Sequence, residues 1–237
     1  MLRALVADCD AVAMLREAAA SGEPRLAAFA LAAELAGVDA VRVSVNESLR
    51  PVRESDLDDL RRVLRRLELQ LAPAPSLLKL ALEVRPDRVV LASEPTPARR
   101  AGTPLDTHAL RTAAPLAARA LREAGIPTLA RIAPDPESVK LARAADVAGV
   151  ELATSGMVEL PDAERALAFE RCADAARIAA KLRLPLGVGG SLATGRLRGL
   201  LAQAPGIEHV TVGRALTGRA LFVGLERAVR ELREEIG

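Results

Sequence analysis

Short apolar runs recur along the whole chain, and a longer segment with helical spacing follows each of them. Runs of this length between turn residues are typical of buried parallel strands. They cover residues 3–8, 40–45, 67–71, 88–92, 128–133, 149–153, 184–188 and 209–212. Eight strand and helix units in strict alternation favour an α/β fold closed as a (β/α)8 TIM barrel over an open doubly wound sheet.

The segments between the predicted strands are helical in pattern. An additional helical segment, residues 10–22, follows the first strand and departs from the minimal barrel pattern. Single long helices are expected over residues 105–124 and 216–235, and the second of these ends the chain. No low-complexity or linker-like stretch divides the sequence, so it predicts one barrel domain over residues 1–237.

Composition narrows the class of protein. Half of the residues are hydrophobic but only 1% are aromatic, and 33 Lys and Arg nearly balance 31 Asp and Glu, for a net charge of +2. Basic residues mixed with acidic ones along amphipathic helices indicate a solvated surface. The aromatic side chains that stack on nucleic-acid bases are nearly absent, so no nucleic-acid partner is expected.

The cysteines and the hydropathy pattern bear on cofactors and location. Cys9 and Cys172 show neither metal-ligand nor disulfide spacing, and the sequence has no zinc, Walker or nucleophile-elbow motif. No apolar stretch is long and charge-free enough to cross a bilayer, and the N-terminal run is too short for a signal peptide. We expect a soluble, cytoplasmic protein with no membrane partner, no metal and no cofactor.

Residues 185–219 hold the strongest candidate binding site. Two strand-like runs there end in glycine and pass directly into a helical pattern. Glycine lets the backbone approach a ligand closely, and the N-terminus of a helix attracts anions. The loops after strands seven and eight of such barrels frequently hold phosphate. The predicted partner is therefore a phosphorylated small molecule, and the predicted phosphate-binding residues are Gly189, Gly190, Ser191, Gly213 and Arg214.

Polar residues at the carboxyl ends of the predicted strands are candidates for chemistry, because barrel active sites lie at that end. They are Asp8, Asp10, Ser44, Glu47, Arg50, Gln70, Glu151 and Thr154. A functional role is favoured for Glu151, because a carboxylate on a buried strand face needs a partner. Turn formation, hydrogen bonding inside the barrel or a solvated loop explains Asp8, Asp10, Gln70 and Glu47 about as well.

The histidines and the longest loop add little to this set. Histidine usually carries proton transfer near neutral pH. His108 begins a helix, however, and His209 begins the eighth predicted strand at the end opposite the rim, so neither is expected in the site. The loop of residues 93–104, rich in Pro and Gly, is either a lid or a surface loop.

Several motifs, taken in order, resemble the pyridoxine 5′-phosphate synthase family. These (β/α)8 barrels condense 3-amino-2-oxopropyl phosphate with 1-deoxyxylulose 5-phosphate in vitamin B6 biosynthesis. The motifs are DAVAMLR, AAELAGVDAVRVSVNESLR, LELQLA, PLDT, VELATSG, and VGGSL followed by VGRALTGRAL. The resemblance implies a phosphate cradle at Gly189 or Gly190 and at Gly213-Arg214, transition-state stabilisation by Glu151, and assembly into a homo-oligomer.

The resemblance fails where the family carries its acid–base chemistry. The family's catalytic histidine on strand two falls on Ser44, its catalytic glutamate on strand three on Gln70, and its histidine after strand seven on Gly190. Its first-strand asparagine becomes Asp8, and its aspartate is kept as Asp10. Because losing one general acid or base lowers a rate by a factor of about 10²–10⁴, the sequence predicts a divergent active site.

Two functions stay open at this point. The first is a vitamin B6 family enzyme, with displaced catalytic groups or a changed reaction on a phosphorylated substrate. The second is a non-catalytic homologue that binds a phosphorylated metabolite or serves as a partner subunit. An unrelated phosphate-binding aldolase or isomerase is less favoured, because Lys79, Lys140 and Lys181 all lie in predicted helices.

Overall fold

The eight predicted strands close into one parallel barrel. A computed structural model of the chain describes residues 3–94, 102–157, 160–190 and 197–237. Neighbouring strands pair in parallel in chain order, and the last pairs with the first, which confirms the (β/α)8 fold. The strands are β1 Ala4–Asp8, β2 Ala40–Ser44, β3 Leu67–Leu71, β4 Arg88–Leu91, β5 Thr128–Ile132, β6 Gly149–Ala153, β7 Leu186–Gly190 and β8 Ile207–Val212.

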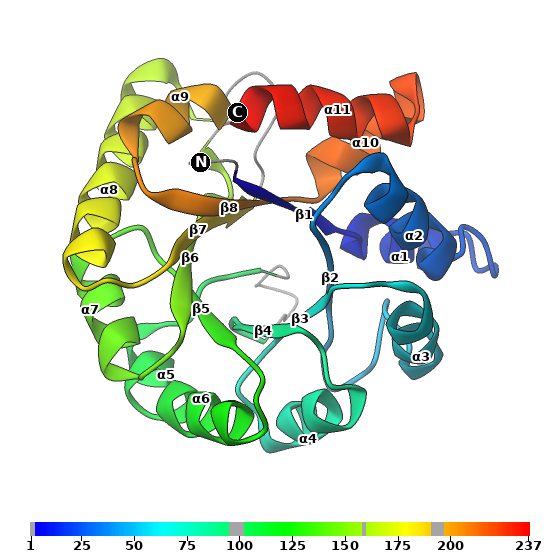
Figure 1. Cartoon of the computed structure of the whole chain (residues 1–237), viewed down its shortest axis with the longest axis horizontal. Coiled ribbons are helices and arrows are strands. Elements are labelled where there is room, and N and C mark those ends of the chain that lie inside the picture. The colour runs from blue at the N-terminus through cyan, green and yellow to red at the C-terminus, as the bar shows by residue number, and fades with distance from the viewer. Residues whose placement is uncertain (1–2, 95–101, 158–159, 191–196) are drawn as a thin grey trace.

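Helices surround the barrel as an outer layer (Figure 1). The described helices are α1 Asp10–Ala18, α2 Leu26–Ala36, α3 Glu54–Val63, α4 Pro75–Val84, α5 Thr107–Arg111, α6 Ala113–Glu123, α7 Pro136–Ala144, α8 Asp162–Lys181, α9 Leu197–Gln203, α10 Arg214–Val223 and α11 Leu225–Ile236. Both α1 and α2 lie between β1 and β2, so the additional helical segment expected after the first strand is confirmed as α1.

The strand residues alternate between two buried environments. Outward-facing residues such as Leu5, Ala7 and Val43 pack against the helices in one continuous hydrophobic core. Arg42 lies between Val41 and Val43 on β2 and is fully buried on the opposite, lumen side. Because both faces of each strand are buried, the strands are nearly continuous apolar runs with single polar residues inside them.

The helix expected over residues 105–124 is in fact two helices, α5 and α6. Pro115, the third residue of α6, has no N–H to donate to the carbonyl of Arg111, where α5 ends. Thr112 lies between the two helices, and its Oγ1 donates to the carbonyl of His108 at 2.8 Å. The missing proline N–H therefore separates the two helices.

The last predicted helix, residues 216–235, is also two helices, α10 and α11. They meet at Gly224, whose φ of +82° is a conformation that L side chains rarely adopt.

The bounds of two strands also differ from the prediction, because β7 includes Gly189 and Gly190 and β8 begins at Ile207. Both glycines thus belong to a strand rather than to the loop after it.

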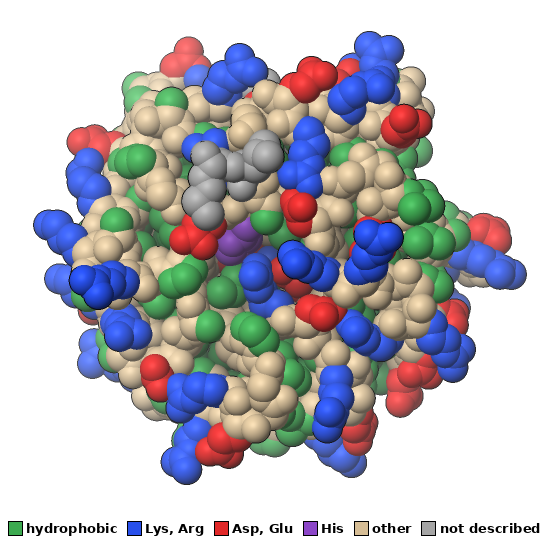
Figure 2. All heavy atoms as spheres, in the orientation of Figure 1, with side chains coloured by type: hydrophobic (Ala, Val, Ile, Leu, Met, Phe, Trp, Pro, Cys, Tyr) green, Lys and Arg blue, Asp and Glu red, His purple; other side chains and the backbone are tan. Residues whose placement is uncertain are grey.

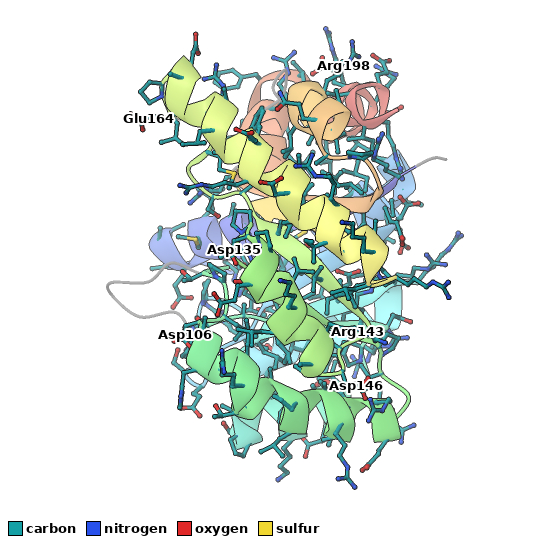
Figure 3. The ribbon with its side chains drawn as sticks, turned by 90° about the vertical axis from the view of Figure 1, so that its left-hand side faces the viewer. Asp106, Asp135, Arg143, Asp146, Glu164 and Arg198 are labelled. Carbon is teal, nitrogen blue, oxygen red and sulfur yellow. The ribbon has the colours of Figure 1, made fainter. Side chains whose placement is uncertain are left out.

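Capping aspartates mark the end of the barrel where the strands terminate. Asp106 Oδ1 accepts a hydrogen bond from Ala109 N, and Asp135 Oδ1 accepts one from Ser138 N, both at 2.8 Å. Figure 3 places both aspartates at one end of the molecule, and Asp146 at the other. The loops that follow the strands therefore share one rim, where barrel active sites are built.

The surface and the hydropathy of the helices add two observations. Lys and Arg side chains are interspersed with Asp and Glu over the face seen in Figure 2, as the sequence predicts. Within the described ranges, no helix is both long enough and apolar enough to span a membrane.

Candidate functional site

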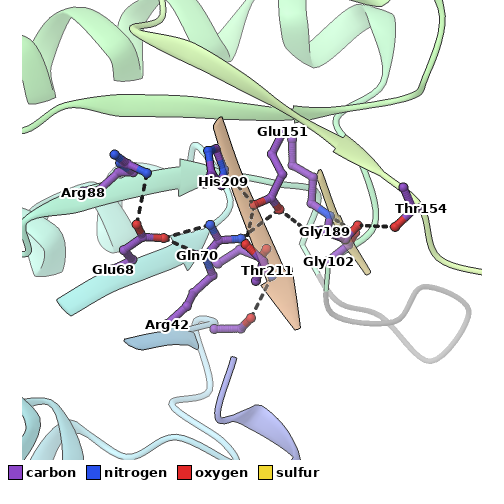
Figure 4. A network of polar contacts seen from close by, with 12 residues as sticks. Arg42, Glu68, Gln70, Arg88, Gly102, Glu151, Thr154, Gly189, His209 and Thr211 are labelled. Carbon is purple, nitrogen blue, oxygen red and sulfur yellow. Dashed lines mark hydrogen bonds and ion pairs between the residues drawn. The ribbon is translucent and has the colours of Figure 1, made fainter. Parts of the chain in front are cut away.

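The lumen of the barrel holds a cluster of charged side chains (Figure 4). Arg42, Glu68, Arg131 and Glu151 enter it from β2, β3, β5 and β6, and each is at most 4% exposed. Bulky aliphatic side chains usually fill this space in such barrels. Buried charges are tolerated when they are paired and hydrogen-bonded, so the contacts of these four residues decide what the cluster does.

Arg42 crosses the lumen and joins two carboxylates. Its Nη1 donates to Glu151 Oε1 at 2.8 Å, while its Nη2 and Nε donate to Glu68 Oε2 at 2.8 and 3.0 Å. Arg88 Nη1 lies 3.2 Å from the other oxygen of Glu68. Both buried carboxylates are therefore neutralised by arginines.

Glu151 uses both of its oxygens inside the barrel. Oε1 accepts from Arg42 and from Arg131, while Oε2 accepts from Thr211 Oγ1 at 2.7 Å and lies 3.3 Å from His209 Nε2. Burial alone raises the pKa of Glu151, but the charges of Arg42 and Arg131 outweigh burial and hold the pKa well below its usual range. The carboxylate thus stays ionised and anchors four neighbours.

Arg131 ties the charged cluster to the end of β7 and to the loop that follows β4. Its Nη2 donates to the carbonyl of Gly189 at 2.8 Å, and its Nε donates to the carbonyl of Gly102 at 2.5 Å. The carbonyl of Gly189 also accepts from the backbone N of Thr154, at 2.9 Å. The ends of β5, β6 and β7 are therefore held together by hydrogen bonds that start at one guanidinium group.

Two glycines of β7 leave the space that these side chains occupy. A Cβ at position 187 would overlap the ring of His209, and a Cβ at position 189 would lie 2.5 Å from Glu151 Oε1. Gly189 therefore has a packing role inside the barrel. Gly190 has φ +142°, and a Cβ there would lie 2.6 Å from Ser155 N.

A pair of aspartates lies at the end of β1. Asp8 Oδ1 accepts from the backbone N of Asp10 at 2.9 Å, and Asp10 Oδ1 accepts from the backbone N of Ser44 at 2.7 Å. Burial and then the neighbouring charge of Asp8 raise the pKa of Asp10 to about 7, and burial also raises the pKa of Asp8. Both groups remain partly exposed at the rim.

Ser44 and Gln70 occupy the neighbouring ends of β2 and β3. Gln70 Nε2 donates to Ser44 Oγ at 2.8 Å, so two positions that are catalytic in the resembled family are joined to each other. Both residues line a small depression that Ser93 and Gly102 also border. Ser44 and Gln70 thus lie together, and their role in a substrate pocket stays a prediction.

The predicted phosphate end lies beside the aspartate pair. Gly190 is in register with Val212, so the ends of β7 and β8 lie side by side. Gly213 is the N-cap of α10, and Arg214 is its first residue and is exposed. A Cβ at position 213 would lie 3.1 Å from Asp8 Cβ. Ser191, also predicted here, lies outside the described residues, as do residues 95–101 of the predicted lid.

Of the remaining predicted residues, Thr154 joins the network at Gly189, whereas Glu47 and Arg50 make their contacts elsewhere. Thr154 is buried, and its Oγ1 donates to the carbonyl of Gly189 at 3.1 Å. Glu47 accepts from Ser76 Oγ at 2.7 Å, and Arg50 lies 3.4 Å from Glu17. Both are exposed, and no described contact joins them to the aspartate pair or to the lumen charges.

Sequence reasoning missed Arg42 and Arg131 as partners of Glu151. The signal was present, because each is a single charged residue within a buried apolar strand, which is the observation that singled out Glu151. The prediction that His209 begins the eighth strand was wrong, but its distance from the rim agrees with its register against Ala4, the first residue of β1. Since β8 begins at Ile207, His209 is the third strand residue and points into the lumen toward Glu151.

Within the described ranges, no three His, Cys, Asp or Glu side chains lie close enough together to hold a metal ion.

These features define a (β/α)8 barrel with a charged lumen, an acidic pair at its rim and a helix N-terminus beside that pair. The model of the family described as Pyridoxal phosphate biosynthesis protein PdxJ matches residues 5–237, and the chain belongs to this family of vitamin B6 biosynthesis. The family resemblance seen in the sequence is thereby confirmed.

Relatives with curated names agree with this assignment. The pyridoxine 5′-phosphate synthase of Desulforapulum autotrophicum is 31% identical over 230 residues, covering 96% of each chain. That of Chlorobium luteolum is 34% identical over 234 residues, covering 98% of this chain and 99% of the relative.

Solved structures share the fold at much lower identity. KGPDC from Streptococcus mutans has a TM-score of 0.67 at 12% identity, covering 100% of this chain and 98% of that one. Thiamine phosphate pyrophosphorylase from Pyrococcus furiosus has a TM-score of 0.65 at 16% identity, covering 99% and 95%. These similarities show the barrel fold alone.

Proposed function

We propose that this barrel binds a phosphorylated small metabolite where β7 and β8 end, and that it acts on it in the family's reaction. That reaction condenses 3-amino-2-oxopropyl phosphate with 1-deoxyxylulose 5-phosphate. The observation that carries the proposal is the position of α10, whose N-cap, Gly213, directly follows β8 and lies one strand away from Gly190.

The chemistry of this end suits a phosphate group. The first N–H groups of a helix have no partner within the helix, and the helix dipole places partial positive charge there. Arg214 adds an exposed guanidinium group, which can bind phosphate oxygens through two hydrogen bonds. A phosphorylated ligand would therefore meet backbone N–H groups and a cation at one place.

Ligand-dependent thermal unfolding tests the binding part of the proposal. Inorganic phosphate and both substrates should raise the midpoint of unfolding, because a ligand that binds only the folded state stabilises it. Arg214→Glu should abolish the increase. Arg230→Glu, the same charge change at an exposed position of α11, should keep it. An unchanged midpoint at high ligand concentration, or an undiminished shift in the Arg214 variant, would count against this site.

A non-catalytic homologue is the second candidate, and one observation favours it. Ser44 and Gln70 hydrogen-bond to each other, and neither side chain titrates near neutral pH. A condensation assay with both substrates, with the product followed by mass, separates the two candidates. Turnover supports the enzyme, whereas binding of phosphate without turnover supports the non-catalytic homologue.

A further inference from the structure

We propose that Asp8 and Asp10 together are the proton-transfer group of this barrel. They replace the family's acid–base side chains, whose positions are occupied here by Ser44 and Gln70. The inference rests on the proposed function, because it assigns catalytic residues to the same reaction. It comes from the position of the two carboxyl groups, their links to the rim of β2 and β3, and an unsatisfied polar atom beside them.

The backbone holds the two carboxyl groups in fixed positions. Asp8 is the last residue of β1 and Asp10 the first of α1, and Asp8 Oδ1 accepts the N–H of Asp10. Asp10 Oδ1 accepts the N–H of Ser44, which places Asp10 at the end of β2. The pair therefore bridges β1 and β2 at the end of the barrel where ligands bind.

A continuous set of contacts runs from this pair to β3. Ser44 binds Asp10 through its backbone N–H and accepts a hydrogen bond from Gln70 through its hydroxyl. Gln70 is only 3% exposed, and among the described residues its Oε1 has no hydrogen-bond partner. A buried amide oxygen without a partner is costly. Because Gln70 lines the depression at this rim, a ligand that donates a hydrogen bond there would satisfy it.

Burial opposes two negative charges on the pair, and for Asp10 the charge of Asp8 adds to this effect. The positive charges of Arg42 and Arg131 lower the pKa of Asp8 and the negative charge of Glu151 raises it, while Arg42 also lowers the pKa of Asp10. Cys9, between the two aspartates, is buried, and their charges together with burial raise the pKa of its thiol. Gly213 packs against Asp8 from the start of α10, where Arg214 follows. Asp10 has a pKa of about 7, so the pair gains and loses a proton near neutral pH.

Such a pair can both give and take a proton in the proposed condensation. When an amine condenses with a ketone, two hydrogens leave the nitrogen, and the carbonyl oxygen leaves as water. The protonated carboxyl can donate its proton to that oxygen, and the resulting carboxylate can accept one from the nitrogen. One such exchange moves one proton and returns the pair to its starting state, so two exchanges move both hydrogens and release one water. No oxidant, reductant or metal is required.

Other titratable groups near the site are less suited to this role. The pKa of Glu151 lies well below its usual range, and both of its oxygens are engaged by Arg42, Arg131, Thr211 and His209. The thiol of Cys9 is fully buried, and its raised pKa keeps it protonated. The aspartate pair is partly exposed at the rim and can therefore contact a ligand.

Substitution by asparagine tests the proposal, because asparagine keeps an oxygen that can accept the N–H of Ser44 or of Asp10. Asp10→Asn should lower kcat by a factor of about 10²–10⁴ while retaining the phosphate-dependent increase in the unfolding midpoint. Asp135→Asn, a capping aspartate at the same rim, is the matched control and should keep turnover. Asp10→Glu should restore part of the rate lost in the asparagine variant.

The pH profile separates proton transfer from a structural role. Turnover that needs a protonated Asp10 should fall as the pH rises through about 7. Asp8→Asn removes a negative neighbour, so the pKa of Asp10 should fall and this limb of the profile should move to lower pH. Carbon-13 NMR of the aspartate carboxyl groups should show the same titration in the protein without substrate, and Asp10→Asn should remove it.

Three outcomes would overturn the proposal. They are turnover that survives Asp10→Asn, a pH limb that stays in place in Asp8→Asn, and an unsubstituted protein that binds phosphate but does not turn over. The last of these leaves the proposed ligand class standing. Turnover without any stabilisation by phosphate would instead contradict the proposed phosphate site and leave the aspartate pair supported.

Discussion

The lumen charges predict a large and pH-dependent loss of stability when Arg42 is replaced by Met, a side chain of similar length. The variant leaves Glu68 and Glu151 with fewer partners, since three hydrogen bonds to two buried carboxylates disappear. Hydrogen bonds to charged groups contribute about 1.5–3 kcal/mol each, but they are not additive when partners remain. Arg131 and Thr211 still bind Glu151, and Arg88 still faces Glu68.

The expected loss is therefore that of one broken buried ion pair, about 3–5 kcal/mol. Total stabilities of domains are about 5–15 kcal/mol, so the variant should remain folded but lower the midpoint of thermal unfolding by roughly 6–20 °C. Urea unfolding at pH 7 measures the free energy directly. Arg230→Met, at an exposed position of α11, is the control and should change stability by no more than about 0.5 kcal/mol.

The pH dependence gives this prediction a second check. In the unsubstituted protein the folded-state pKa of Glu151 is depressed, so its stabilising contribution is present above the unfolded-state pKa and is lost as the pH falls. Without Arg42 that pKa should rise, so the deficit of the variant should be full at pH 7 and should shrink as the pH falls around and below the unfolded-state pKa of about 4.3. Adding Glu68→Met should recover stability, because Arg131 and Glu151 remain as a balanced pair. A deficit below about 1 kcal/mol, or no recovery in the double variant, would refute the reasoning.

Three further predictions follow from the same structure. Gly187→Ala should lower the midpoint of thermal unfolding, because the new Cβ would overlap the ring of His209. Adding His209→Ala to the same chain should restore much of the loss. An unchanged midpoint in the single variant would show that the ring has room to move. The folded-state pKa of Asp10 is raised to about 7, so the free energy of unfolding should decrease as the pH rises from 4 to 7. This decrease should be larger in the unsubstituted protein than in Asp10→Asn. Parallel curves of stability against pH for the two proteins would contradict the prediction. We expect a homo-oligomer, and the candidates for its interface are Leu221 and Phe222 on α10, which are 75% and 86% exposed. Phe222→Glu should therefore reduce the molecular mass measured by light scattering. An unsubstituted protein that is already monomeric would exclude this interface.

Sequence reasoning succeeded where local pattern and tertiary context agree. Eight apolar runs separated by helical segments are sufficient to predict the closed barrel, because strands buried on both faces need helices around them. The limit of sequence reasoning appears in the segments 105–124 and 216–235, each predicted as one helix and each folded as two. Pro115 and Gly224 interrupt segments whose apolar spacing continues on both sides, so periodicity alone predicts one helix where the backbone forms two.

The candidate site was predicted only as far as strand ends could be located. Asp8, Asp10, Ser44 and Gln70 were expected at the rim, and contacts link them there. The lumen network was not predicted, because its partners are far apart in sequence: Arg42 and Glu151 are separated by 109 positions. Only the closure of the barrel brings such residues together.

Gly187 and Gly189 of β7 make the interior of this barrel epistatic. Gly187 and Gly189 leave the space that His209, Glu151 and Arg131 occupy, so larger residues in β7 are compatible only with smaller ones on β5, β6 and β8. A single exchange at any of these positions should be deleterious, although a combined exchange need not be. The lumen of this chain is therefore expected to have changed as a set during divergence, and transplanting it into a relative would require moving all of these residues together.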